Sequence, residues 1–397
     1  MALRRFQAPP LLGEPVRGDR AFWTATAAYV TGWTAHTTFI FYLAPIALRL
    51  AGDEGHDAWV FTGTALASML AVLPAGRLTD RVPRRRVLRG ALALLAASYA
   101  PLLIAPPTLA GVLLATALTG AGLGFLFVSF NAYVPDLLAE RHAGSAYGHA
   151  AAWSVLASAA GPAIAATAFR LAPDLPGLRS NAGFFAAAAL VGLALTFRLP
   201  HAARHDKGLR PPLRAELPYL VPAVVAYGLV GMGYGMTLPY FTVHFLDHVR
   251  VPKETWGYAL AVGTFATALG SMAAGSVARR GASERVLAGA QFFLFLASVA
   301  FAFPLAAPLL LVAFVARSVF GSTTAPVVNT ILASRVHEDA RGRAQGVGSL
   351  AWNVGWATGA AAGGLLLAPL GGALFPVGGG LAFVGSALAA VLFARAR

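Results

Sequence analysis

The sequence contains no cysteine, and charged residues make up only 12% of its 397 residues. The absence of cysteine excludes disulfide frameworks, thiolate zinc sites and cysteine nucleophiles together. Soluble chains are roughly a quarter charged, so this chain has too few charges to cover a water-exposed surface. With 57% hydrophobic residues, the composition is that of a membrane protein without a large soluble domain.

Acidic residues are also scarce, and the excess of basic residues gives a formal net charge of +14. This excess does not predict a nucleic-acid partner, because nucleic-acid-binding surfaces gather basic and aromatic residues on a folded polar face. Here the charges separate apolar runs instead. We expect no nucleic-acid partner, no metal and no cofactor.

The apolar runs are long enough to cross a bilayer, which takes about 20 residues per helix. Twelve such runs predict an all-α membrane protein with twelve transmembrane helices. The predicted crossings are 21–48, 58–75, 87–105, 108–134, 144–169, 181–197, 217–246, 255–278, 286–303, 309–334, 344–369 and 372–393.

A polar stretch after the sixth crossing divides the chain into two sets of six. We therefore expect five regions. They are a cytoplasmic N-terminal tail (1–20), an N-terminal six-helix bundle (21–197), a cytoplasmic linker (198–216), a C-terminal six-helix bundle (217–393) and a cytoplasmic tail (394–397).

Basic residues are distributed unequally between the two sides of the predicted crossings. Twenty-four lie on the side of the termini and five on the other side. Since basic residues near span ends stay in the cytoplasm, both termini are predicted to be cytoplasmic, in a multi-pass protein of the cytoplasmic (inner) membrane. Trp59 and Trp256 open two crossings on the outer side, where indole rings commonly anchor a protein at the membrane surface.

The two halves of the sequence repeat each other. An offset of 198 residues places Asn131 on Asn329 and Gly161 on Gly359, among other matches. Two similar bundles that face each other are the architecture of a carrier, with its site at their interface near the bilayer midplane. A receptor or scaffold has no need of such duplication.

The segment GRLTDRVPRRR (76–86) follows the second crossing and carries a recognisable pattern. It fits G-x-x-x-D-R-x-G-R-R at Gly76, Asp80, Arg81, Arg84 and Arg85. This pattern resembles the signature of the major facilitator superfamily, and the duplicated twelve-span organisation of that family extends over almost the whole chain. The resemblance implies a fold of two pseudo-symmetric six-helix bundles.

In that family the motif forms a cytoplasmic latch that ties the bundles together while the site faces outward. The resemblance implies this role for Asp80 and Arg84, with Asp136 at the end of the fourth crossing as a partner. Pro83 replaces the second glycine of the pattern and cannot take the positive φ that glycine permits, which puts the geometry of the loop in question. In the second repeat Arg279 stands where Asp80 stands in the first.

The fifth crossing contains ASAAGPAIAA (157–166), which resembles the glycine-rich stretch of the family's drug and proton antiporters at Gly161 and Pro162. A proline inside a helix removes a backbone hydrogen bond and bends it. The resemblance favours an exporter, while a bent packing helix of no special function is the alternative interpretation.

In the family, the first, fourth, seventh and tenth crossings line the cavity, with help from the second, fifth, eighth and eleventh. Aromatic and polar residues at helical spacing in three of these crossings are the candidate substrate-binding residues, although such stripes also serve packing. They are Tyr29, Trp33, His36 and Thr37 in the first, Tyr227, Tyr234 and Tyr240 in the seventh, and Trp352, Asn353 and Trp356 in the eleventh.

Arg317 is a charge inside the tenth crossing, where insertion costs about 2.5 to 3.5 kcal/mol. All sixteen acidic residues can be placed in tails, loops or span ends, so no carboxylate partner is evident. Three interpretations follow. Arg317 satisfies helix carbonyls in a structural position, binds an anionic group of the substrate, or takes part in proton coupling.

Proton-driven carriers usually keep a carboxylate in the membrane, and none lies mid-span here. His36, which titrates near neutral pH when unperturbed, and Asp136 are the candidate coupling residues. Uncoupled facilitation or exchange is the alternative.

We predict a secondary transporter that moves a small organic solute by alternating access, as an exporter of amphipathic, drug-like or lipid-like compounds. Uptake or facilitated diffusion of a polar or anionic metabolite, such as a sugar or organic acid, is the second hypothesis. The expected partners are the substrate, the lipid bilayer and protons, and we expect a monomer. A membrane enzyme would need paired catalytic groups at depth, which the sequence does not offer.

Overall fold

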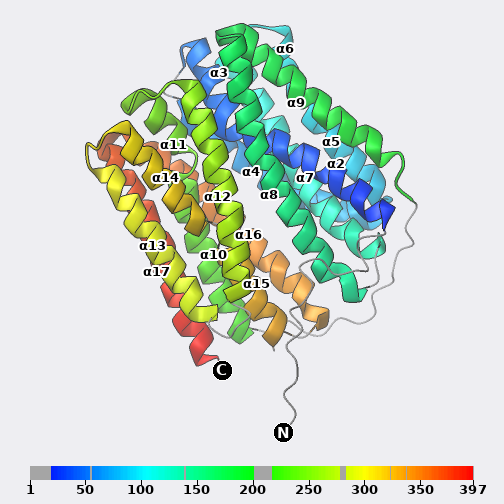
Figure 1. The fold of residues 1–397 in the computed structure, drawn as a ribbon. Helices are drawn as coiled ribbons and strands as arrows, with labels where there is room; N and C mark the ends of the chain where they lie inside the picture. The colour runs from blue at the N-terminus through cyan, green and yellow to red at the C-terminus, as the bar shows by residue number, and fades with distance from the viewer. Residues whose placement is uncertain are drawn as a thin grey trace, which may run out of the picture.

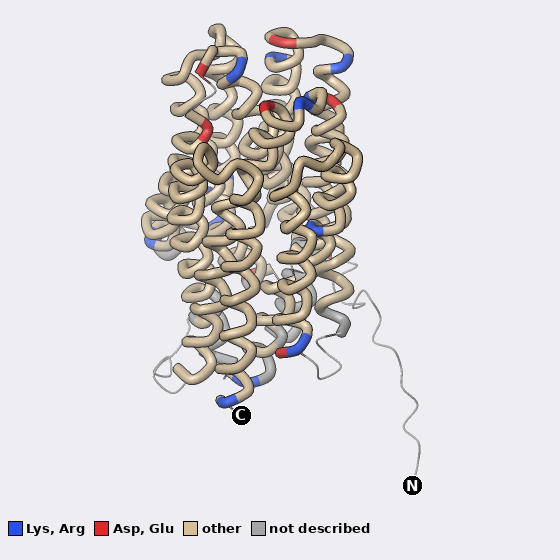
Figure 2. Tube along the Cα trace, turned by 90° about the vertical axis from the view of Figure 1, so that its left-hand side faces the viewer, with Lys and Arg blue, Asp and Glu red and all other residues tan. Residues whose placement is uncertain are grey.

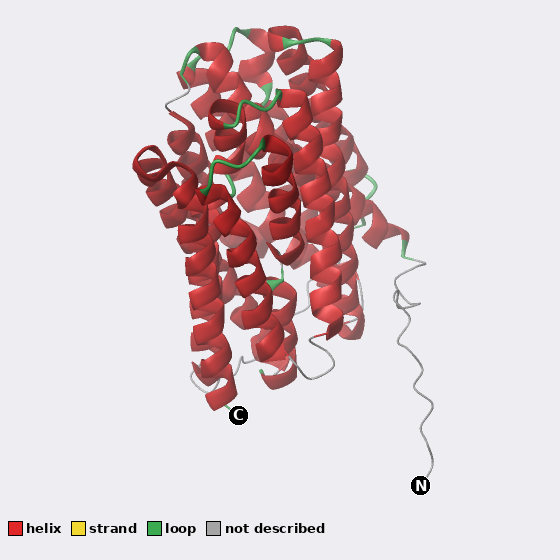
Figure 3. Cartoon of the chain, turned by 60° about the vertical axis from the view of Figure 1, so that its left-hand side comes forward, coloured by secondary structure: helices red, strands yellow, loops and turns green. Residues whose placement is uncertain are grey.

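Helices make up the regular structure of the protein, as its long charge-poor runs predict (Figure 3). The computed structural model describes residues 19–53, 56–137, 140–200, 217–277, 283–321, 323–336 and 338–396, and no strand occurs in these ranges. Most of the predicted tail 1–20 and linker 198–216, and Arg397 of the C-terminal tail, lie outside the described residues.

The N-terminal half contains six crossings, two of which are built from consecutive helical segments. Its elements are α2 (Arg20–Thr38), the π-helix η1 (Phe39–Leu43), α3 (Ala44–Ala51), α4 (Asp57–Arg81), α5 (Arg84–Ala97), α6 (Ala100–Ile104), α7 (Leu109–Leu137), α8 (Glu140–Leu171) and α9 (Asp174–Thr196).

The C-terminal half follows the same plan. Its elements are α10 (Leu217–Thr237), α11 (Tyr240–Val243), the π-helix η4 (His244–His248), α12 (Lys253–Val277), α13 (Ser283–Val299), η6 (Ala300–Ala302), α14 (Ala307–Gly321), α15 (Thr324–Arg335), α16 (Glu338–Leu370), η7 (Gly371–Ala373) and α17 (Leu374–Arg395).

The number of crossings agrees with the sequence. Ten stretches of the described residues are long and apolar enough to span a membrane. One of them, Gly346–Arg395, holds both α16 and α17, which a turn at Gly371 with a φ of 50° separates. The run from α2 through η1 to α3 adds a further crossing. Twelve crossings result, which confirms the prediction.

These crossings form two bundles of six that stand side by side (Figure 1). In the first bundle α2 packs against α7, α8 and α9, and in the second α10 packs against α15, α16 and α17. The bundles contact each other through α4 with α16 and through α8 with α12. The internal repeat relates these two contacts, because α4 corresponds to α12 and α8 to α16.

The molecule has two ends, which we call the terminal end and the far end. The terminal end is where α2 begins and α17 ends, and the far end is the opposite one, which holds α3, α6 and α11 (Figure 1). Charged residues gather mostly toward these two ends and leave a largely uncharged middle (Figure 2). Leu66, Leu70 and Leu73 on α4 are exposed. Apolar residues exposed on a crossing suit contact with lipid.

Small residues set the distance between helices inside each bundle, and they recur with the repeat. A side chain on Gly161 of α8 would meet Thr38 of α2. A side chain on the repeat-related Gly359 of α16 would meet the backbone of Met232 in α10. Glycine at these positions therefore permits the same close helix contact in both halves.

Candidate functional site

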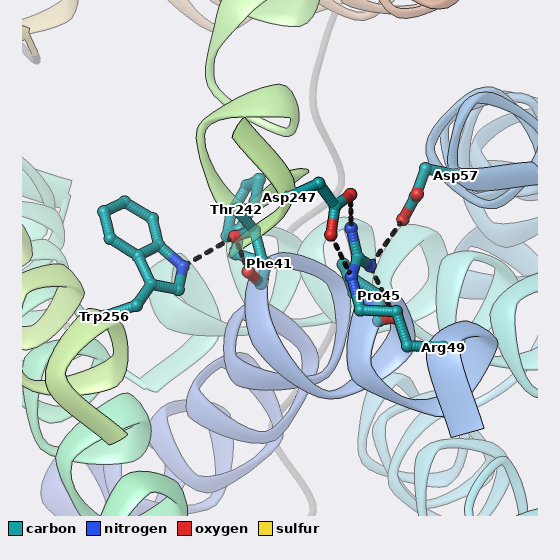
Figure 4. A network of polar contacts seen from close by, with 7 residues as sticks. All are labelled: Phe41, Pro45, Arg49, Asp57, Thr242, Asp247 and Trp256. Atoms are coloured by element: carbon teal, nitrogen blue, oxygen red, sulfur yellow. Dashed lines mark hydrogen bonds and ion pairs between the residues drawn. The ribbon is translucent and has the colours of Figure 1, made fainter. Parts of the chain in front are cut away.

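One arginine links the two halves at the far end (Figure 4). Arg49, in the last turn of α3, donates from Nε to Asp247 Oδ1 at 2.9 Å, and its Nη2 also contacts this carboxylate. Asp247 belongs to η4 of the other half. Nη1 of Arg49 donates within its own half to the carbonyl oxygen of Pro45 at 2.7 Å and lies 3.5 Å from Asp57 Oδ1.

An uncharged contact joins the halves beside this ion pair. The Thr242 hydroxyl of α11 donates to the carbonyl oxygen of Phe41 in η1, and Trp256 Nε1 donates to the same hydroxyl at 3.0 Å (Figure 4). Trp256 is fully buried and stacks on Phe245 with centroids 4.5 Å apart. The prediction that Trp256 anchors the chain at the membrane surface is therefore wrong, whereas Trp59 is 62% exposed, as an anchor requires.

Two tyrosines that the 198-residue offset relates fill the two contacts between the halves. The Tyr42 hydroxyl donates to the carbonyl oxygen of Lys253 at 2.7 Å, and a side chain on Gly257 would meet the Tyr42 ring. Tyr240 packs edge-on against Phe61 of the other half with centroids 5.3 Å apart. Tyr240, predicted as a cavity residue, thus lies between α4 and α16 in this structure.

The predicted stripe on the first crossing forms one group of rings. Tyr29 stacks on Trp33 with centroids 5.9 Å apart, and Trp33 lies 6.3 Å from the His36 ring. Thr37 donates to the Ser158 hydroxyl of α8 at 3.3 Å. Tyr29 and His36 are buried, while Trp33 and Thr37 are partly exposed. His36 Nδ1 has no hydrogen-bond partner among the described residues.

A second group of rings lies on the eleventh crossing. Trp352 and Trp356 stack with centroids 6.1 Å apart, and Tyr234 lies 5.7 Å from Trp352. Trp356 also packs edge-on against Phe41 of the other half at 6.1 Å. Both tryptophans and Asn353 are partly exposed. Packing therefore leaves Trp33 partly accessible in one half, and Trp352 and Trp356 partly accessible in the other.

Two other candidates are packed inside the C-terminal bundle. The Tyr227 hydroxyl donates to Asn329 Oδ1 at 3.0 Å. The Tyr234 hydroxyl donates to the carbonyl oxygen of Gly321. Because both rings are buried, these tyrosines join α10 to α14 and α15 rather than present a free hydroxyl.

Arg317 also lies inside the C-terminal bundle and is 1% exposed. Its Nε donates to the Ser298 hydroxyl at 3.2 Å, and its Nη2 donates to the Thr237 hydroxyl at 2.9 Å. The guanidinium carbon is 5.3 Å from the centroid of Tyr234 and 4.9 Å from that of Phe241. Hydroxyls and ring faces of one bundle thus solvate this charge.

The signature motif is mostly helical, because α4 continues to Arg81 and α5 begins at Arg84. Pro83 fits between them with a φ of −51°, so this connection needs no glycine. Arg84 pairs with Asp136 at the end of α7 and donates to the carbonyl oxygen of Ala132 at 2.6 Å.

The other motif residues are placed as follows. Gly76 lies in α4 and is open to a side chain. Arg81 is exposed, and Arg85 donates to the carbonyl oxygen of Leu199 at 2.9 Å. The backbone of Asp80 belongs to the last turn of α4, and its side chain lies outside the described part of the structure. The contacts of Arg84 and Arg85 stay within the N-terminal half.

The predicted helix-bend motif is buried at the contact of α8 with α2. Gly161 and Pro162 are both buried, and α8 continues as a helix through Pro162 to Leu171. Proline therefore does not end this helix.

Sequence reasoning missed the far-end residues that join the halves. A signal was present, because Arg49 and Asp247 are 198 residues apart, the offset of the repeat. Tyr42 and Tyr240 are related in the same way. In a two-fold arrangement, a position beside the axis meets its own equivalent. Opposite charges at one pair of equivalent positions therefore suggest a contact.

The sequence model of the Major Facilitator Superfamily matches residues 13–222 and 223–397 of the chain. No protein with a curated description matches the sequence.

Two solved structures share the fold. The nucleoside transporter NupG is 12% identical, with a TM-score of 0.73 over 95% of this chain and 99% of its own. A bacterial homologue of the iron transporter ferroportin, in its inward-facing state, is 14% identical, with a TM-score of 0.71 over 95% of this chain and 98% of its own. At these identities the likeness establishes the fold alone.

Proposed function

The chain belongs to the major facilitator superfamily of membrane transporters, and from that premise we propose that it exports amphipathic, drug-like or lipid-like compounds across the cytoplasmic membrane by alternating access. A monomer with two six-helix bundles is sufficient for this mechanism, because the site lies between the bundles.

The aromatic rings of the two halves are the observation that supports this class of substrate. Tyr29 and Trp33 stack on the first crossing, and Trp352 and Trp356 stack on the eleventh. The partly exposed rings of Trp33, Trp352 and Trp356 suit flat or apolar solutes. An aromatic pair contributes about 0.5 to 1.5 kcal/mol beyond its buried area. The likeness of Gly161 and Pro162 to the antiporter stretch favours export.

The distribution of basic residues supports a cytoplasmic position for the terminal end. The far end then faces outward. Because Arg49, Tyr42 and Thr242 join the halves there, the site would be closed to the outside in this structure and reached from the cytoplasm.

The latch and the coupling residues complete the proposal. Arg84 and Asp136 are paired at the terminal end, where the family signature places the latch with Asp80. His36 is buried in the first crossing with Nδ1 free of partners among the described residues. This imidazole is a candidate to exchange a proton during the cycle, with Asp136 as the other candidate.

Uptake of a polar metabolite is the second candidate function. One solved structure with the same fold is a nucleoside transporter, and a nucleobase is a flat ring that stacks on aromatic side chains. The same ring pairs would then bind the base.

Direct flux measurements separate the two candidates. Proteoliposomes with purified protein would be loaded with a cationic aromatic dye or a nucleoside, with and without a pH gradient. Dye efflux that depends on the gradient supports the exporter. Nucleoside flux without dye flux supports the alternative, and dye efflux that ignores the gradient contradicts proton antiport.

The binding role of the rings is tested with Trp33→Ala and Trp356→Ala. Each change removes one stacking face, so we expect the affinity for the dye or nucleoside to fall about 2- to 12-fold. Trp59→Ala is the matched control, because Trp59 is 62% exposed at the far end and its ring contact in the described residues is an edge-on one with His56 at 5.6 Å. Equal affinity in all three variants would contradict this site.

A further inference from the structure

We propose that Arg49, Asp57 and Asp247 form a charge-exchange gate at the far end. Arg49 binds Asp247 while the halves are joined there, and it keeps its ion pair with Asp57 when the halves part. This inference rests on the alternating access proposed above, and it assigns to Asp57 the role of a positioning residue for Arg49.

The partners of Arg49 divide between the two halves. Asp247 accepts a hydrogen bond from Nε of Arg49 at 2.9 Å and also contacts its Nη2. Asp247 belongs to the C-terminal half and moves with it. Pro45 and Asp57 bind Nη1 and belong to the same half as Arg49. Separation of the halves therefore breaks the contacts of Nε and Nη2 and leaves those of Nη1 intact.

The internal repeat explains why this pair meets. Arg49 and Asp247 are 198 residues apart, so they occupy equivalent positions in the two halves. Equivalent positions meet only beside the pseudo-two-fold axis. With identical residues there, like charges would repel, and the opposite charges found here turn the same proximity into an attraction.

The two carboxylates, Asp57 and Asp247, differ in burial and therefore stabilise different states of the gate. The side chain of Asp57 is 6% exposed, that of Arg49 17% and that of Asp247 35%. A poorly solvated guanidinium that lost its only carboxylate would oppose opening strongly. Since Asp57 stays with Arg49, it stabilises the parted state, whereas Asp247 stabilises the joined state.

The backbone around the gate is also specialised. Arg49 lies in the last turn of α3, the helix that follows the π-helix η1, and Asp247 lies within the π-helix η4. Such segments are frequent at functional sites. A surface pocket lined by Leu50, Leu246 and Lys253 opens beside the ion pair, so Asp247 is reached by solvent when Arg49 leaves it.

A second ion pair between the halves borders the same pocket but is more exposed than the gate. Lys253 Nζ is 2.7 Å from Asp174 Oδ1, but the Asp174 side chain is 70% exposed. Exposed pairs contribute little because water solvates both charges. Asp174→Asn is therefore a matched control that removes one carboxylate from the same end of the molecule.

Because the chain contains no cysteine, a single introduced cysteine can report whether the far end opens. Ala166 of α8 is fully buried at the far end, where a side chain on Gly257 of the other half would meet it. Ala166→Cys in the full chain then carries a single thiol, which a maleimide reaches only when the halves part at this end. The labelling rate of the purified protein reports opening without knowledge of the substrate.

Asp→Asn changes at the two gate carboxylates should act in opposite directions. Asp247→Asn should raise the labelling rate roughly tenfold, because a charged hydrogen-bonded pair is lost from the joined state. Asp57→Asn should lower the rate by up to about fivefold, because Arg49 then has no carboxylate to keep on opening. Asp174→Asn should change it by less than about twofold.

Several outcomes would overturn the gate. If Asp57→Asn and Asp247→Asn both raise the labelling rate, Asp57 only holds the fold together. An Asp174→Asn effect equal to that of Asp247→Asn would show a general effect of charge. If the parent thiol never reacts, the far end does not open and alternating access fails as well. If it reacts at a rate that none of the variants alters, only the gate fails.

Discussion

At the scale of single residues, Arg317 shows how a bundle holds a charge without a carboxylate. Its Nε and Nη2 are each bound by a hydroxyl, and two rings face the guanidinium carbon. No ion pair involves Arg317 in the described ranges. All these partners belong to the C-terminal half, which favours the structural interpretation over contact with a substrate between the halves.

A structural role predicts a specific response to substitution. Arg317→Met should unfold thermally within a few degrees of the parent, because an apolar chain of similar length fills the space and removes the cost of a buried charge. Arg317→Ala should lose about 2 to 5 kcal/mol, because it leaves a cavity. Thermal unfolding of the purified protein, followed by tryptophan fluorescence, measures both.

The same variants test the binding interpretation. If Arg317 binds an anionic substrate, Arg317→Met would fold normally but lose the thermal stabilisation that organic anions give the parent. Equal stabilisation of both proteins by a panel of organic acids would support the structural role.

At the scale of elements, the helices that join the halves depend on small residues. Gly257 of α12 faces Ala166 and the hydroxyl of Tyr42 in the other half. Gly364 of α16 faces Ala58 in the same manner at the repeat-related contact. These glycines allow each helix pair to approach closely at the far end.

We expect Gly257→Ala to weaken the joined state. The new Cβ would lie 2.6 Å from that of Ala166, so the helices must move apart. Hydrogen exchange of the segments around Arg49 and Asp247, measured by mass spectrometry, should then become faster. The control is Gly289→Ala in α13, where an added Cβ has no neighbour within 4 Å. Faster exchange in both variants would indicate general loosening instead.

The signature segment illustrates how an element differs from its sequence pattern. The sequence suggests a loop over residues 76–86, but α4 continues to Arg81 and only Val82 and Pro83 connect it to α5. Helix propensity and packing extend the helix past the apolar run. Pro83 then fits because its position takes a negative φ, which the pattern alone does not reveal.

At the scale of the whole molecule, we propose that the two ends control opposite states. The far end is joined through Arg49 and Asp247, and the proposed latch lies at the terminal end near Asp80. If the latch stabilises the state that is open at the far end, Asp80→Asn should lower the labelling rate of Ala166→Cys several-fold. Loss of one hydrogen bond to a charged group costs about 1.5 to 3 kcal/mol.

A neighbouring arginine provides the control for this prediction. Arg77→Gln changes an exposed charge in the same stretch of α4 and should leave labelling unchanged. An Asp80→Asn protein that labels at the parent rate would remove Asp80 from the latch.

The sequence by itself determined the twelve helices, the duplication and the family. Apolar runs with few charges can satisfy their backbone groups in a bilayer only as helices, and the repeat at an offset of 198 residues states that the two halves share a fold. Through the family resemblance it also named Asp136 as a partner of the latch residues Asp80 and Arg84, and the structure pairs Asp136 with Arg84.

Only the tertiary structure decided which residues join the halves and which remain inside one bundle. Trp256 and Arg317 each occupy a helix whose pattern is equally consistent with a membrane anchor, a ligand or packing. A helical pattern states which face a residue occupies but not which helix that face meets. The contacts of Thr242 with Phe41, and of Arg49 with Asp247, depend on how two bundles are placed beside one axis. That placement arises from packing across the whole molecule.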